Sequence, residues 1–88
     1  MPINIYIKKT AEEVAYLADD DWGLPSQLFV LEVWLDENQT LLKPNDYVAD
    51  IGFVANTETS GSGGSFSCKA MKIASALGVE IFFSEYPR

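Results

Sequence analysis

The side chains that could do chemistry in this sequence are mostly carboxylates close to aromatic rings. They fall into two groups, one over residues 19–22 and one over residues 32–37. Carboxylates around aromatic anchors are typical of a surface that binds a basic protein, because the rings supply contact area and the charges steer the partner. We therefore predict a partner-binding surface made of Asp19, Asp20, Asp21, Trp22, Glu32, Trp34, Asp36 and Glu37.

Few residues of the sequence could act as catalytic groups. The sequence contains no histidine, which removes the most frequent general base near neutral pH and the Ser-His-Asp and Cys-His arrangements. Its single cysteine, Cys68, has neither a second thiol nor a histidine with which to bind zinc, and we interpret it as a small buried hydrophobe. The run Asp19–Asp21 lacks the alternating oxygen-ligand spacing of a calcium loop. We expect no enzyme, no metal and no cofactor.

A glycine-rich stretch leaves a second kind of site open. Backbone amides between a strand and a helix can cradle an anion, and a lysine on the helix would assist. The stretch does not match a phosphate-binding loop, because Phe66 stands where the second glycine is needed. The alternative is therefore a small anion- or nucleotide-binding module that uses Gly61, Gly63, Gly64, Ser65 and Lys69.

Length and charge narrow the classes further. The 88 residues suffice for a single domain, residues 1–88, and 13 acidic against 6 basic residues give a formal net charge of −7. A surface of this sign repels phosphate backbones, so we expect no direct nucleic-acid binding. We expect neither a signal peptide nor a membrane span, because no basic segment is followed by a long apolar run, and we expect a reducing cytoplasm from the lone cysteine.

The order of elements follows from hydrophobic spacing. Residues 3–8 alternate as a strand, and Thr10 with Glu13 forms a capping box that predicts a helix from residue 11. The apolar run 27–35 predicts a long strand, with Phe29, Leu31, Val33 and Leu35 on its core face.

The second half of the chain shows the same kinds of signal. Residues 40–43 predict an optional short strand, and residues 47–55 predict a longer one. A helix over 66–77 follows, with Ser65 as N-cap and Gly78 as the residue that stops it, and a last strand covers 79–85.

The resulting order β-α-β-β-α-β predicts an α+β two-layer sandwich of the ferredoxin-like kind, with a mostly antiparallel sheet and both helices on one face. The opening strand would lie near the centre of the sheet. The helix-free face would then carry Tyr6, Glu32, Trp34 and Phe82.

In size, acidity and lack of catalytic groups, the chain resembles the small bacterial immunity proteins of toxin–immunity systems, of the contact-dependent inhibition or bacteriocin type. The resemblance implies a cytoplasmic protein that neutralises a cognate basic, nuclease-type toxin through the acidic, aromatic surface above. Anti-CRISPR-type inhibitors share this profile and remain an alternative. A further alternative is a homodimer formed through the open sheet face or a strand edge.

Overall fold

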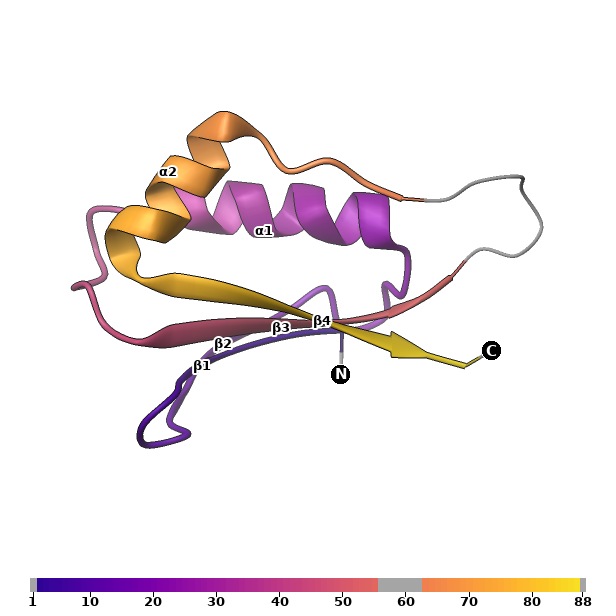
Figure 1. The fold of residues 1–88 in the computed structure, drawn as a ribbon, viewed down its shortest axis with the longest axis horizontal. Coiled ribbons are helices and arrows are strands. Elements are labelled where there is room, and N and C mark those ends of the chain that lie inside the picture. Colours follow the sequence, from indigo (N-terminus) through magenta and orange to yellow (C-terminus); the bar gives the residue numbers. More distant parts are fainter. Residues whose placement is uncertain (1, 56–62, 88) are drawn as a thin grey trace.

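In the part of the chain that the structure describes, four strands form one mixed sheet, and the two helices lie against the same face of it (Figure 1). The computed structural model describes residues 2–55 and 63–87. In chain order the elements are β1 (Ile3–Ile7), β2 (Glu13–Leu17), α1 (Leu24–Asn38), β3 (Tyr47–Val54), α2 (Cys68–Leu77) and β4 (Val79–Tyr86). The sheet order is β2-β1-β3-β4, in which β1 is antiparallel to both neighbours and β3 is parallel to β4.

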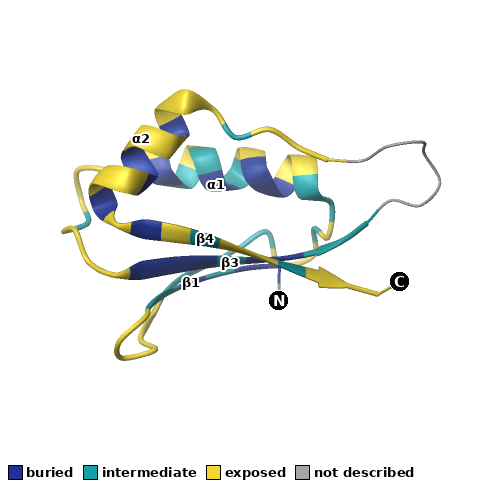
Figure 2. Cartoon of the chain, in the orientation of Figure 1, coloured by how far each residue is buried: buried dark blue, intermediate teal, exposed yellow. Residues whose placement is uncertain are grey.

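The core fills the space between the sheet and the helices (Figure 2). Successive residues of a strand point to opposite faces, so only alternate residues of β1 and β3 enter this space. The helices close it with one face each. The buried side chains include Ile3, Ile5, Ala49 and Ile51 from the sheet and Leu28, Leu31, Leu35, Ile73 and Leu77 from the helices.

The long strand predicted over 27–35 is wrong, because this stretch lies inside α1. The buried residues of the helix follow helical spacing, and they are Gln27, Leu28, Leu31 and Leu35. Pro25 lies in the first turn, where no intrahelical partner for its missing N–H is needed. Phe29 and Val33, which strand alternation assigns to the core, are 67% and 41% exposed. The apolar residues of this stretch therefore surround a helix instead of alternating along a strand.

The helix predicted from residue 11 is also wrong, because the chain forms a hairpin there and continues as β2. Ala11 has a φ of 59°, a left-handed value that a regular helix excludes. Thr10 Oγ1 accepts a hydrogen bond from the backbone N–H of Glu12 at 3.2 Å, so it closes a turn instead of capping a helix. Strand β2 then pairs with β1, with Leu17 opposite Ile3.

The second half of the chain confirms the predicted strand over 47–55, helix over 66–77 and strand over 79–85, with small shifts at their ends. The N-cap is Ser67 and not Ser65, because Ser67 Oγ accepts from the N–H of Ala70 at 3.0 Å. Gly78 ends the helix with a φ of 87°, as predicted. Residues 40–43 lie in a loop, without the optional strand.

The α+β class and the position of β1 between two other strands agree with the prediction. The ferredoxin-like, mostly antiparallel arrangement is not confirmed. The observed order is β-β-α-β-α-β, and β3 and β4 form a parallel pair joined through α2. A parallel pair needs such a crossover, because its second strand must begin at the same end as the first.

Candidate functional site

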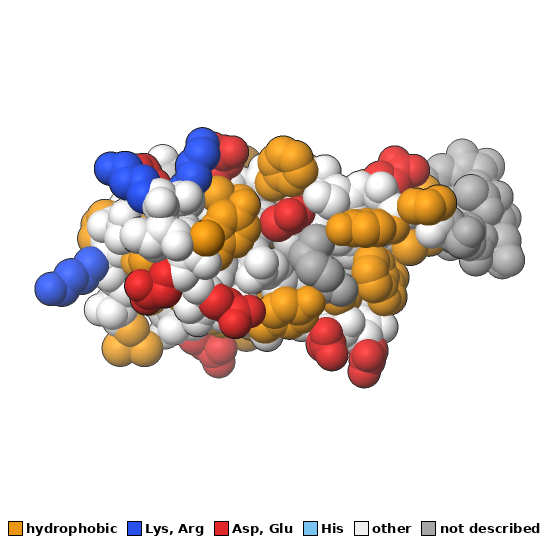
Figure 3. All heavy atoms as spheres, turned by 90° about the horizontal axis from the view of Figure 1, so that it is seen from below, with side chains coloured by type: hydrophobic (Ala, Val, Ile, Leu, Met, Phe, Trp, Pro, Cys, Tyr) orange, Lys and Arg blue, Asp and Glu red, His pale blue; other side chains and the backbone are white. Residues whose placement is uncertain are grey.

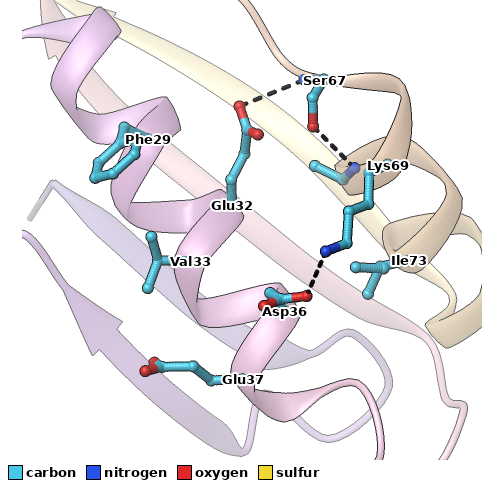
Figure 4. Close-up of a pocket in the computed structure, with 9 residues that line it drawn as sticks. Phe29, Glu32, Val33, Asp36, Glu37, Ser67, Lys69 and Ile73 are labelled. Atoms are coloured by element: carbon cyan, nitrogen blue, oxygen red, sulfur yellow. Dashed lines mark hydrogen bonds and ion pairs between the residues drawn. The ribbon is translucent and has the colours of Figure 1, made fainter.

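The outer side of α1 carries exposed apolar residues that the core does not use. Phe29 and Val33 lie one helical turn apart, and we call this pair the α1 ridge. Figure 4 shows Phe29, Val33 and Glu37 along one side of the helix, and Glu32 and Asp36 along the side that faces α2. The two rows follow from the helical period, which brings residues four apart onto the same side.

On the α2 side of the ridge lies a groove of about 300 Å³, here called the acidic groove. Its lining comes from α1, from the N-cap of α2 and from α2 itself, and consists of Phe29, Glu32, Val33, Asp36, Glu37, Ser67, Lys69, Ala70 and Ile73. Three of these residues are predicted partner-binding carboxylates. The structure therefore brings Glu32, Asp36 and Glu37 together with an exposed phenylalanine.

Two of these carboxylates connect the helices. Glu32 Oε2 accepts from the backbone N–H of Ser67 at 3.3 Å, where the positive end of the α2 dipole favours a negative charge. Asp36 Oδ1 lies 3.1 Å from Lys69 Nζ, and both side chains are more than half exposed. Such an exposed pair contributes at most about 1 kcal/mol to stability. The lysine can therefore be displaced from Asp36 at little cost.

On the other side of the ridge, towards β2, lies a groove of about 250 Å³, here called the apolar groove. Its lining residues are Leu17, Phe29, Val30, Val33, Trp34 and Glu37. Trp34 lines this groove, is half-buried and packs against the core. Trp34 and Glu32 belong to α1, and the prediction that they share the helix-free sheet face is wrong.

The remaining predicted residues, Asp19 to Trp22, lie in the connection from β2 to α1. They precede the N-terminus of a helix, where negative charge is favourable, and do not follow a C-terminus as the predicted helix would require. Asp21 Oδ1 accepts from the N–H of Gly23 at 3.0 Å, while Asp19 and Asp20 are exposed. From there to Glu37 the helix rises on the order of 20 Å, at about 1.5 Å per residue. The first predicted group therefore precedes α1, and the second lies along the second half of that helix.

Trp22 is 37% exposed and packs edge-to-face on Tyr86 of β4, with the ring centroids 5.5 Å apart. Its carbonyl oxygen accepts from the N–H of Val54 at 2.9 Å. These contacts fix Trp22 against the end of the sheet, away from the α1 ridge. Trp22 is therefore an exposed aromatic residue separate from the ridge, in the same connection as the exposed Asp19 and Asp20.

Gln27 attaches this acidic connection to the sheet. Its Nε2 is buried and donates to the carbonyl oxygens of Asp21 at 2.6 Å and Gly52 at 2.7 Å. We expect Gln27→Leu to lower the free energy of unfolding by about 2 kcal/mol, because two carbonyls lose their donor. Urea unfolding followed by circular dichroism would measure this. The control is Gln39→Leu, since the Gln39 amide contacts Asp36 on the surface; equal effects of the two changes would contradict the prediction.

The residues of the alternative anion site are placed as follows. Gly61 lies outside the described residues, and Gly63, Gly64 and Ser65 are exposed. The first N–H of the α2 terminus and Lys69, which would attract an anion, contact Glu32 and Asp36 respectively. A phosphate would have to displace one of the chain's own carboxylates from each. The groups that could attract an anion are therefore already in contact with carboxylates of the chain.

Cys68, predicted to be buried, is exposed at the first residue of α2, because the buried face of this helix runs through Ala70, Ile73, Ala74 and Leu77. Within residues 2–55 and 63–87, no cluster of three or more acidic or cysteine side chains is arranged to hold a metal ion. No helix in the same ranges combines the length and apolarity needed to cross a membrane.

No protein-family model, curated protein or solved structure matches the chain. What it does must therefore follow from the geometry and charge of its own surfaces. The composition of the sequence points to the carboxylates but not to Phe29 and Val33. The signal that finds them is a second apolar pair at helical spacing, offset from the core face of α1.

Proposed function

We propose that this chain is a protein-binding inhibitor that captures a basic partner on the outer side of α1. The observation that carries the proposal is Phe29, which is 67% exposed between the acidic groove and the apolar groove, with Glu37 in the lining of both. With Val30, Val33 and Trp34 it forms a continuous apolar strip along the helix. A strip of this kind, rimmed by charge, is typical of an interface.

The charges define the partner's chemistry. The chain carries 13 acidic and 6 basic residues, so it accelerates encounter with a cationic protein. At the acidic groove, an arginine of the partner would replace Lys69 on Asp36. The exchange is favourable because a guanidinium can bind a carboxylate through two parallel hydrogen bonds, which an ammonium cannot. Glu37 offers a second carboxylate at the edge of the same groove.

We further propose that the partner is a cationic toxin domain of the nuclease type and that the chain is its immunity protein in the bacterial cytoplasm. Carboxylates held on a rigid helix can occupy sites that the toxin uses for phosphate. We assign the chain no reaction of its own: the exposed carboxylates and rings bind, and their effect is to block the partner.

The test uses the product of the reading frame next to this chain in its source genome. We expect the two proteins to co-purify as a complex and the toxin activity to be lost in it. The dissociation constant should rise by at least about tenfold between 50 and 500 mM salt, because surface charge pairs are screened. A partner that does not bind, or binding that ignores salt, would contradict the proposal.

Two charge variants locate the surface. Glu32→Gln/Asp36→Asn/Glu37→Gln removes three charges from α1, and Glu12→Gln/Glu13→Gln/Glu85→Gln removes three exposed charges elsewhere. We expect the first to weaken binding by about tenfold or more and the second to change it much less, since both alter the total charge equally. Isothermal titration calorimetry measures the difference. Equal losses would show that total charge, and not the acidic groove, governs binding.

A further inference from the structure

Among the residues that the structure describes, no strand pairs with the outer edge of β4. It is the last strand in the order β2-β1-β3-β4 and runs for eight residues, Val-Glu-Ile-Phe-Phe-Ser-Glu-Tyr. Edge strands of soluble proteins are commonly blunted by lysine, proline, a bulge or short length. The opposite edge, β2, has five residues and pairs with a register shift. In contrast, β4 is longer and carries neither a lysine nor a proline, and five of its eight residues are apolar, with Phe82 and Phe83 53% and 52% exposed.

An apolar groove of about 450 Å³ runs beside this edge, between β4 and α2, and we call it the edge groove. Ile81 and Phe83 form its floor, and Met71 and Ser75 of α2 and Phe66 form part of its wall. Met71 is 50% exposed there. The backbone hydrogen-bonding groups of β4 and an apolar groove thus lie side by side, which is the arrangement that accepts an added strand.

We propose that the occupant is β4 of a second copy of this chain, paired antiparallel about a two-fold axis at Phe82. This register places Phe82 opposite its own copy and Ile81 opposite Phe83 twice. Glu80 then lies opposite Ser84, and Glu85 lies opposite Val79, so no two carboxylates meet. The product is a continuous eight-stranded sheet with all four helices on one face.

The neighbouring registers are less favourable. A shift of one residue centres the pairing between Phe82 and Phe83, and it places Glu80 opposite Glu85 on both sides of the axis. Like charges directly opposite are destabilising. That shift also places the helices of the two copies on opposite faces, because each step of one residue turns a strand over. Centring on Phe83 instead places Ile81 opposite Glu85.

Charge gives this contact a salt dependence opposite to that of the α1 surface. Each copy carries a net charge of −7, so two copies repel one another, while the centre of the contact, Ile81 to Phe83, is apolar. The helix-free face mixes acidic with hydrophobic side chains, and its basic residues lie together at one end (Figure 3). Added salt screens the repulsion, so dimerisation should strengthen with salt. Added salt should instead weaken the capture of a basic partner. The salt dependence therefore tests the two proposals independently.

Sedimentation equilibrium of the full chain tests the dimer. We expect a monomer–dimer equilibrium that shifts towards dimer from 50 to 500 mM salt. Phe82→Lys should weaken it at least about tenfold, because a charge on an edge strand opposes pairing. The matched control is Phe29→Lys on α1, which should leave the equilibrium unchanged. A chain that stays monomeric at the highest concentration and salt, or a Phe82→Lys variant that dimerises normally, would overturn the proposal.

Cysteine cross-linking in a Cys68→Ser background tests the register. Phe82→Cys should form a disulfide-linked dimer under mild oxidation, because directly opposite residues lie within about 5.5 Å. Ser84→Cys alone should not, since its copy lies about 13 Å away along the strand. Mixing Ser84→Cys with Glu80→Cys should restore the cross-link. Cross-linking of Ser84→Cys alone, or none with Phe82→Cys, would reject the register.

Discussion

Alanine in place of Phe29 is expected to weaken binding of the proposed basic partner by about 30- to 1000-fold while the fold stays intact. An aromatic anchor at the centre of an interface commonly accounts for about 2–4 kcal/mol of binding. Phe29 has this position because a groove lies on each side of it. The free energy of unfolding should change by less than about 0.5 kcal/mol, since the side chain is mostly exposed and alanine favours a helix.

Leu41→Ala is the matched control for this change. Leu41 is 76% exposed in the loop after α1 and lines neither groove of the ridge. Calorimetric titration of both variants, together with their urea midpoints, separates a loss of contact from a loss of fold. If the two variants bind equally well, the α1 ridge is not the anchor, even if the chain does neutralise a basic protein.

The misassigned strand and the candidate site have the same cause. The stretch 27–35 has more apolar residues than one core face needs, so its pattern fits a strand with two covered faces as well as a helix. The core uses Leu28, Leu31 and Leu35, and the surplus, Phe29 and Val33, is left exposed. The stretch itself does not indicate which of its apolar residues remain exposed, because that depends on which side of the helix the other elements of the fold pack against.

The first hairpin shows where local signals are insufficient. The Thr10–Glu13 pair is a correct capping-box pattern, but a side chain that can cap a helix can also close a turn. The left-handed φ values at Ala11 and Ala18, 59° and 51°, bound β2 on both sides. Alanine gives no hint of such values, since its sequence preference is for a right-handed helix. By contrast, the strict alternation of residues 3–7 and the glycine after Leu77 predicted their elements correctly.

The contacts within the site depend on tertiary structure. Glu32 and Ser67 are 35 residues apart in sequence, and they meet only because α1 and α2 lie together over one face of the sheet. The sequence identifies the carboxylates by type, and the strand prediction would have placed Glu32 on the opposite side of the sheet from α2. Because this stretch forms a helix and not a strand, the spacing of Glu32 and Asp36 by four residues directs both towards α2 (Figure 4).

We expect Gly78→Ala to lower the free energy of unfolding by about 3 kcal/mol or more. Two terms add. The φ of 87° is a conformation that an L-residue adopts with strain, and a Cβ at this position would lie 2.2 Å from the carbonyl oxygen of Asn45. The neighbour is backbone and cannot rotate away. Moving it would strain the hydrogen bonds from Asn45 N–H to Leu77 O and from Tyr47 N–H to Gly78 O, which fix the start of β3.

Gly63→Ala is the control, because a Cβ there meets nothing within 4 Å and the backbone shows no left-handed φ. Its effect should stay within about 0.5 kcal/mol. Urea unfolding of both variants by circular dichroism gives the comparison, and the Gly78 variant should also lose the concentration-dependent dimer, because β4 begins at the next residue. A Gly78→Ala chain as stable as the parent would mean that the loop before β3 does not close against the end of α2. The parallel pairing of β3 with β4 would then lack the contact that sets its register at Tyr47 and Val79.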